Sequence, residues 1–164
     1  MGLDGRGGFN PTQPRGECII YRIVWPAIRQ HRSITNVSHL LHFCYTDVNR
    51  TIKADQEKIR QVIQNLIDNA VKFTDKGYVK VTINQEPESV LITVSDTGRG
   101  MSKEMQKQAF ERFTRDESVK KEIQGTGLGL YIAREIVSAH HGEIWAESGG
   151  EGQGSRFFVR LRKD

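Results

Sequence analysis

An unbroken amphipathic stripe is the clearest pattern along the chain. Its apolar residues recur at helical intervals at Ile59, Val62, Ile63, Leu66, Ile67, Ala70 and Val71. This spacing predicts a helix over residues 56–74 that buries one face. Asp55 precedes the stripe, where a carboxylate can cap the first free N–H groups, and Gly77 follows it as a natural stop.

Period-two alternation predicts strands in the second half of the chain. Residues 79–83 and 90–94 alternate in this way, and residues 85–89 between them suit a hairpin loop. Two more strands are predicted at 143–147 and 155–162, with a Gly-rich turn between them. Earlier strand candidates lie at 40–45 and 49–54.

Shorter helices are predicted at 18–29, at 103–113 and from the Gly-rich segment 125–130 onward. Because tight hairpins pair strands antiparallel, the interleaved elements predict an α+β fold. We expect a two-layer α/β sandwich with a mixed, mostly antiparallel sheet and helices packed on one face. The polar residues 114–124 are expected to form a mobile loop. His140 and His141 close the last predicted helix, where a structural role is expected.

The beginning of the chain has a different composition. Residues 1–16 are rich in Gly and Pro and predict a disordered tail or an added expression segment. The chain has 164 residues, and this length predicts a single domain over residues 17–164.

Composition excludes several classes of protein without naming a function. Apolar residues make up 37% and charged residues 27%, which is ordinary for a soluble domain. The net charge is only +4 and the basic residues are interspersed with acidic ones, so no nucleic-acid partner is expected. Cys18 and Cys44 form neither a disulfide framework nor a zinc motif, so a reduced, cytoplasmic setting is expected. No apolar run reaches the about 18 residues of a membrane span.

Polar side chains on the predicted long helix form the first candidate site. Asn65, Asn69 and Lys72 fall on one narrow stripe beside the apolar face. Carboxamide oxygens are hard ligands that suit Mg²⁺, and an ammonium group pairs with phosphate. For each of these residues an ordinary solvated helix face is the open alternative.

Two glycine-rich turns form the second and third candidate sites. The glycines at 125, 127 and 129 precede a predicted helix and leave backbone N–H groups free to attract an anion. A flexible loop is the alternative. Asp96 ends an apolar strand before Gly98 and Gly100; its carboxylate can accept an exocyclic amine such as that of adenine, and the glycines admit a flat ring. An aspartate in an ordinary turn is the alternative.

Other nucleotide-binding motifs are missing from the sequence. There is no Gly-Lys dipeptide of a Walker loop and no Asp-Phe-Gly, and the glycine spacing does not match a Rossmann fingerprint.

Five segments, taken in order, resemble the ATP-binding catalytic domain of sensor histidine kinases. Their superfamily (GHKL) also holds gyrase, heat-shock chaperone and mismatch-repair ATPases. Residues 65–74 resemble the N box, 96–101 the first glycine box, 110–115 the F box, 125–130 the second glycine box and 154–157 the small terminal box. The resemblance covers residues 50–164.

The resemblance implies a role for each box. Asn69 would hold Mg²⁺ with Asn65 assisting, and Asp96 would accept the adenine amine. Residues 111–125 would form a lid over ATP, with Arg112 or Arg115 reaching toward the nucleotide or a partner. The implied nucleotide-binding residues are Asn65, Asn69, Lys72, Phe73, Asp96, Gly98, Gly100, Met101, Phe110, Phe113, Arg115, Gly125, Thr126, Gly127, Leu128, Gly129 and Ser155.

The resemblance also separates transfer from hydrolysis. Gyrase-like members carry a Glu general base four residues before the metal-binding Asn. This chain has Asn65 there, and an amide cannot take a proton from water. The implied activity is therefore that of a protein-histidine kinase in two-component signal transduction: Mg²⁺ and ATP are bound, and the γ-phosphoryl group goes to a histidine on a dimerisation domain and then to a response regulator.

The acceptor histidine is not expected on this chain, so no catalytic residue is assigned. Ser38-His39 superficially resembles an acceptor site but lacks the acidic residue that should follow the histidine. Two alternatives stay open: a serine-directed kinase of the anti-sigma type, and a non-catalytic module that binds nucleotide, or a partner through residues 103–124. The isolated domain is expected to be a monomer without a membrane segment.

Overall fold

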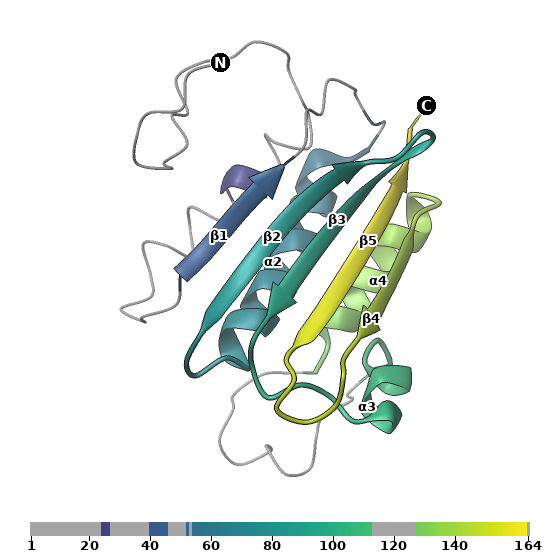
Figure 1. Cartoon of the computed structure of the whole chain (residues 1–164). Coiled ribbons are helices and arrows are strands. Elements are labelled where there is room, and N and C mark those ends of the chain that lie inside the picture. The colour runs from purple at the N-terminus through teal and green to yellow at the C-terminus, as the bar shows by residue number, and fades with distance from the viewer. Residues whose placement is uncertain (1–23, 27–39, 46–51, 53, 113–126, 164) are drawn as a thin grey trace, which may run out of the picture.

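The fold consists of one five-stranded sheet with helices on a single face (Figure 1). The computed structural model describes residues 24–26, 40–45, 52, 54–112 and 127–163. The strands are β1 (Leu40–Tyr45), β2 (Tyr78–Gln85), β3 (Ser89–Asp96), β4 (Glu143–Glu147) and β5 (Ser155–Arg162). Their order is β1-β2-β3-β5-β4; β1 runs parallel to β2 and every other neighbouring pair is antiparallel.

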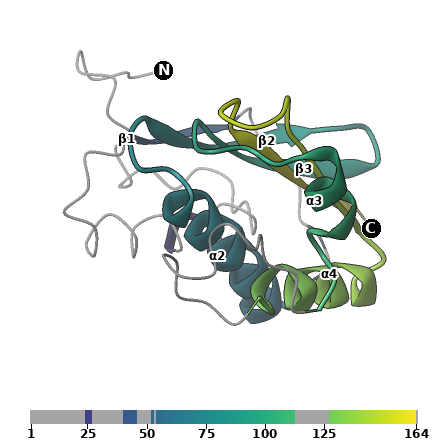
Figure 2. The same ribbon diagram turned by 90° about the horizontal axis from the view of Figure 1, so that it is seen from below.

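The longer described helices are α2 (Gln56–Lys72), α3 (Lys103–Gln108) and α4 (Gly129–Ala139), and residues 24–26, within the helix predicted at 18–29, are also helical. Figure 2 shows the sheet as one layer and α2 and α4 side by side as the other. The predicted two-layer α+β sandwich with a mixed, mostly antiparallel sheet is confirmed. In the part of the chain that the structure describes, no helix has the length and apolar character needed to cross a lipid bilayer.

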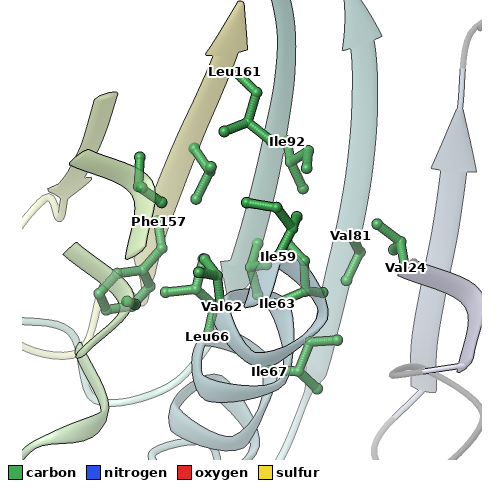
Figure 3. Packing of buried hydrophobic residues seen from close by; sticks show 14 of the residues in the cluster. Val24, Ile59, Val62, Ile63, Leu66, Ile67, Val81, Ile92, Phe157 and Leu161 are labelled. Carbon is green, nitrogen blue, oxygen red and sulfur yellow. The ribbon is translucent and has the colours of Figure 1, made fainter. Parts of the chain in front are cut away.

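The hydrophobic core lies between α2 and the sheet (Figure 3). The apolar stripe of α2 is completely buried at Ile59, Ile63 and Leu66. Alternate residues of β2, β3 and β5 face it, among them Val81 and Ile92, which are also fully buried. Each such side chain contributes about 1.5–3 kcal/mol relative to an exposed one. The periodicity of the sequence therefore selects the face that each element turns inward.

Helix α2 begins where the sequence predicts and ends slightly early. The Asp55 carboxylate accepts the backbone N–H groups of Glu57 and Lys58 at 3.0 and 3.1 Å, so the predicted N-cap is confirmed. The helix ends at Lys72 rather than at residue 74. The Thr74 hydroxyl turns back to donate to the Ala70 carbonyl at 2.7 Å, which satisfies one of the last free carbonyls of the helix.

Two other sequence predictions were wrong. The helix predicted over 103–113 stops at Gln108, because Phe110 turns inward and is buried in the core. The strand candidate at 49–54 is not a strand at Ile52 or Ala54, although Ile52 is only 3% exposed. The predicted tail at 1–16 and loop at 114–124 lie outside the described residues, as does most of the helix predicted at 18–29.

The end of α4 is joined to the beginning of α2 through His140. Its Nδ1–H donates to the Ile136 carbonyl at 2.8 Å, and its Nε2 accepts the backbone N–H of Asp55 at 3.1 Å. These two bonds require the neutral ring with its proton on Nδ1. The next residue, His141, has a φ of 54°, in the left-handed region that usually ends a helix with glycine. Both histidines therefore have structural roles at this helix end.

We expect His141→Gly to stabilise the domain by about 0.5–1 kcal/mol. A β-carbon in the left-handed region costs about 1–2 kcal/mol, and the greater backbone freedom of glycine in the unfolded chain offsets part of that gain. Urea unfolding of the two proteins measures the difference. His141→Ala, which keeps the β-carbon, should show no comparable gain. A lower unfolding midpoint for His141→Gly would contradict this account.

Candidate functional site

Helix α2 carries the predicted carboxamides and contacts the start of α4. The Asn65 side chain donates from Nδ2 to the backbone carbonyl of Gly129 at 2.9 Å. This bond fixes the orientation of the carboxamide and leaves its oxygen, Oδ1, as an acceptor. Asn69 lies one turn further along α2, and both residues are half-buried. The predicted polar stripe therefore borders the second glycine segment.

The C-terminal end of α2 contacts the turn that follows Asp96. The backbone N–H of Arg99 donates to the Phe73 carbonyl at 3.1 Å. A β-carbon on Gly98 would lie 2.1 Å from the same carbonyl oxygen, which no real side chain tolerates. Gly98 is therefore required by the close approach of the protein's own backbone, whatever room it also leaves for a ligand.

Asp96 is held in place at the end of β3. One carboxylate oxygen, Oδ1, accepts the backbone N–H of Gly98 at 2.9 Å and that of Ser155 at 3.2 Å. The residue is only 8% exposed, and this burial raises the pKa of its carboxyl group above the ordinary value, while the two hydrogen bonds oppose the rise. Within the described ranges no group donates to the second oxygen, Oδ2. It is the atom that a bound amine could reach.

Two cationic side chains lie close to the ring of Phe73. The Lys72 ammonium lies 5.5 Å and the Arg99 guanidinium 5.6 Å from the ring centroid, both within the range of a cation–π contact. The sequence prediction included Lys72 and Phe73 but missed Arg99, because the ring contact joins residues from separate segments.

Helix α4 begins without a side-chain cap. Leu128 stands at the N-cap position and has no oxygen with which to accept the first N–H groups. Gly127, just before it, has a φ of 69°. An uncapped helix start combines free N–H donors with the positive end of the helix dipole, which together attract anions. The glycine spacing predicted an anion site at this helix start, and for Gly127, Leu128 and Gly129 that role stays a prediction.

The other predicted nucleotide-binding residues lie in different environments. Phe110 is buried, with its ring edge-on to Phe157 and the centroids 6.4 Å apart, so it belongs to the hydrophobic core. Gly100 has a φ of 72° and packs against the Gly150 carbonyl. Met101 is half-buried against the core. The predicted residues Phe113, Arg115, Gly125 and Thr126 lie outside the described residues.

Arg112 contacts α4 in the structure. Its guanidinium donates to the Tyr131 hydroxyl at 2.7 Å and lies 4.5 Å from the centroid of that ring. Among the described residues, no three His, Cys, Asp or Glu side chains gather as a metal centre built from those residues would require.

Comparison with known proteins identifies the family. The model of the family "Histidine kinase-, DNA gyrase B-, and HSP90-like ATPase" matches residues 54–164. Sensor histidine kinase WalK of Bacillus subtilis (strain 168) is 43% identical over 114 residues, covering 67% of this chain and 18% of WalK. The chain therefore belongs to this ATPase family, and the predicted resemblance is confirmed.

Solved structures share the fold. Mycobacterial sensor histidine kinase MprB gives a TM-score of 0.74 at 22% identity, over 87% of this chain and 93% of that one. Full-length ShkA in complex with AMPPNP gives 0.73 at 27% identity, over 87% of this chain and 29% of ShkA. The chain thus spans less than a third of WalK and of ShkA.

We expect Gly98→Ala to destabilise the domain by about 1–3 kcal/mol, because the new methyl group would force the turn away from the Phe73 carbonyl. Gly149→Ala is the matched control, since its β-carbon would lie 3.2 Å from the β-carbon of the exposed Gln153 and its φ is not in the left-handed region. Its cost should be clearly smaller. Equal urea midpoints for the two variants would show that the contact at Gly98 is unimportant.

Proposed function

We propose that this domain binds ATP together with Mg²⁺ and donates the γ-phosphoryl group to a histidine on a separate dimerisation domain, from which a response regulator receives it. The observation that carries the proposal is the double contact of α2, which joins the start of α4 through Asn65 and the turn after Asp96 through Phe73. Helix α2 thus carries two carboxamides. It also contacts the turn after Asp96, which offers an acceptor for an amine, and the start of α4, which offers free N–H groups.

The adenine end of the site is formed around Asp96. Its Oδ2 atom would accept the exocyclic amine of the base, while Ser155 and Gly98 hold the carboxylate through Oδ1. A charged acceptor makes such a hydrogen bond stronger than a neutral one. Phe73, Gly98, Gly100 and Met101 would line the space for the base.

The phosphate end of the site combines carboxamides, a cation and the start of α4. The oriented oxygen of Asn65 and that of Asn69 are ligands that Mg²⁺ accepts, so the residues present fit the ion. When bound, Mg²⁺ would neutralise part of the charge on the phosphates. Lys72 would pair with phosphate, and the N–H groups at Gly127 and Gly129 would face it.

The segment before α4 would complete the phosphate end. In this proposal Gly125, Thr126 and Leu128 belong to the same glycine segment, Phe110 and Phe113 anchor the segment that covers the nucleotide, and Arg115 reaches toward it.

Transfer to another protein fits the site better than hydrolysis. The amide nitrogen of Asn65 donates to the Gly129 carbonyl, and the carboxamide has no basic atom that could activate water. The nucleotide would then wait for a nucleophile from outside, and the names of WalK and MprB as sensor histidine kinases support a histidine as that nucleophile.

We assign residues 17–164 to this domain as a monomer, with no nucleic-acid partner, and place it in the cytoplasm, where ATP is supplied.

We expect Asp96→Asn to lower the affinity for ADP about tenfold or more, because a hydrogen bond to a charged acceptor is lost. The parent should also lose affinity as the pH falls toward the raised pKa of Asp96, since protonation removes the charge of the acceptor. Calorimetric titrations from pH 7.5 to 5 measure both effects, and Asp96→Asn should not share this loss. Equal affinities for the two proteins at every pH would refute the assignment of Asp96.

We expect the domain to transfer label from γ-labelled ATP to histidine-bearing dimerisation domains of sensor kinases, and this label should be lost in acid. Asn69→Ala should abolish the transfer and remove the Mg²⁺ dependence of ATP binding. An acid-stable label would favour a serine-directed kinase instead. A folded sample that binds no ATP in the calorimeter would overturn the proposed function.

A further inference from the structure

Arg99 lies beside the proposed nucleotide-binding residues, and its guanidinium has no polar partner among the described residues. We propose that Arg99 is a further nucleotide-binding residue, whose guanidinium binds the phosphate nearest the ribose. The inference rests on the proposed function, in which Asp96 binds the base of an adenine nucleotide and Lys72 pairs with its outer phosphates.

The backbone of Arg99 is held on both sides. Its N–H donates to the Phe73 carbonyl at 3.1 Å, and its carbonyl accepts the N–H of Gly152 at 2.6 Å. These two bonds fix the start of the side chain at the contact between the C-terminal end of α2 and the turn after Asp96. From there the side chain reaches the Phe73 ring, where the guanidinium lies 5.6 Å from the centroid.

The Phe73 ring brings Arg99 close to both ends of the proposed site. The Lys72 ammonium lies 5.5 Å from the same ring centroid, and Asp96 begins the turn that carries Arg99. A nucleotide bound by Asp96 at its base and by Lys72 at its outer phosphates has its ribose and first phosphate between these two residues. Phe73 joins the segments of both, so Arg99 is placed where that middle part of the nucleotide is expected.

The contacts of Arg99 differ from those of the other described arginines that lie near aromatic rings. Each of the others also has a polar partner: Tyr131 for Arg112, Glu135 for Arg134, Glu147 for Arg156 and Glu143 for Arg160. Within the described ranges the Arg99 guanidinium contacts only the ring. It shares that ring with the Lys72 ammonium, and two cations near one ring repel each other. An anion bound beside them would remove this repulsion.

Phosphate is the part of an adenine nucleotide that such a guanidinium attracts. Adenine and ribose are neutral, whereas the phosphates are anions at neutral pH. A guanidinium offers its N–H donors in a planar fork that matches two phosphate oxygens, and its charge makes these hydrogen bonds stronger than neutral ones. The contact with Phe73 also restricts the long side chain before a ligand arrives, so less conformational entropy is lost on binding.

The test measures the affinities of ADP, AMP and adenosine by displacement of a fluorescent ADP analogue. We expect Arg99→Gln to lower the affinities for ADP and AMP about tenfold, because a charged hydrogen bond to phosphate is lost, and to leave the affinity for adenosine unchanged. Arg99→Lys keeps the charge without the planar fork and should lose less. The difference between Arg99→Gln and the parent should shrink from about 50 to 500 mM NaCl, since salt screens charges that are partly exposed.

A matched control is available at the opposite end of the sheet. Arg162→Gln removes the same charge at an exposed position that pairs with Ser89, at the end of β3 far from Asp96. It should bind all three ligands as the parent does. An ADP affinity that is equal in Arg99→Gln and the parent would overturn the inference. An equal loss of adenosine affinity would also overturn it, because Arg99 would then support the base pocket, and so would an equal loss in Arg162→Gln, which indicates a general effect of charge. A folded parent that binds none of the three ligands would refute the proposed function itself.

Discussion

The packing of α2 across the sheet is the constraint on which the rest of the structure depends. Its apolar face is buried at Ile59, Ile63 and Leu66, so neither its rotation nor its height above the sheet can change without opening the core. Its polar edge is fixed by the same packing, and Asn65 and Phe73 meet the two glycine segments from opposite ends of that edge. The hydrophobic core and the proposed site are therefore set by one helix.

The strongest periodic patterns of the sequence predicted most of the fold. The stripe of α2 and the alternation of β2, β3 and β5 were identifiable because each element buries one face, and burial selects residues at the period of the element. The helix predicted at 103–113 was too long because local spacing does not reveal that Phe110 turns into the core beside Phe157. Ile52 is buried although it belongs to no strand, so its apolar character did not indicate a strand.

The candidate site was predictable only where its residues form contiguous segments. The boxes around Asn65, Asp96 and Gly127 carry short patterns, whereas the bonds that hold them together connect distant positions. Ser155 reaches Asp96 across 59 positions, because β3 and β5 pair in antiparallel register. The Gln106 side chain donates to the Ser148 carbonyl across 42 positions, and these residues have no local pattern, since a glutamine on a short helix and a serine after a strand are common. Such contacts are revealed only by the folded structure.

The bond between His140 and Asp55 has a consequence for ligand binding. Together with the Asn65–Gly129 bond it joins the two helices at two distant points, and both bonds oppose sliding or rolling of α4 against α2. The free N–H groups at the start of α4 consequently point in a direction that is settled during folding. For the anion that we propose binds there, less free energy would be spent on ordering the protein, which is the thermodynamic advantage of preorganisation.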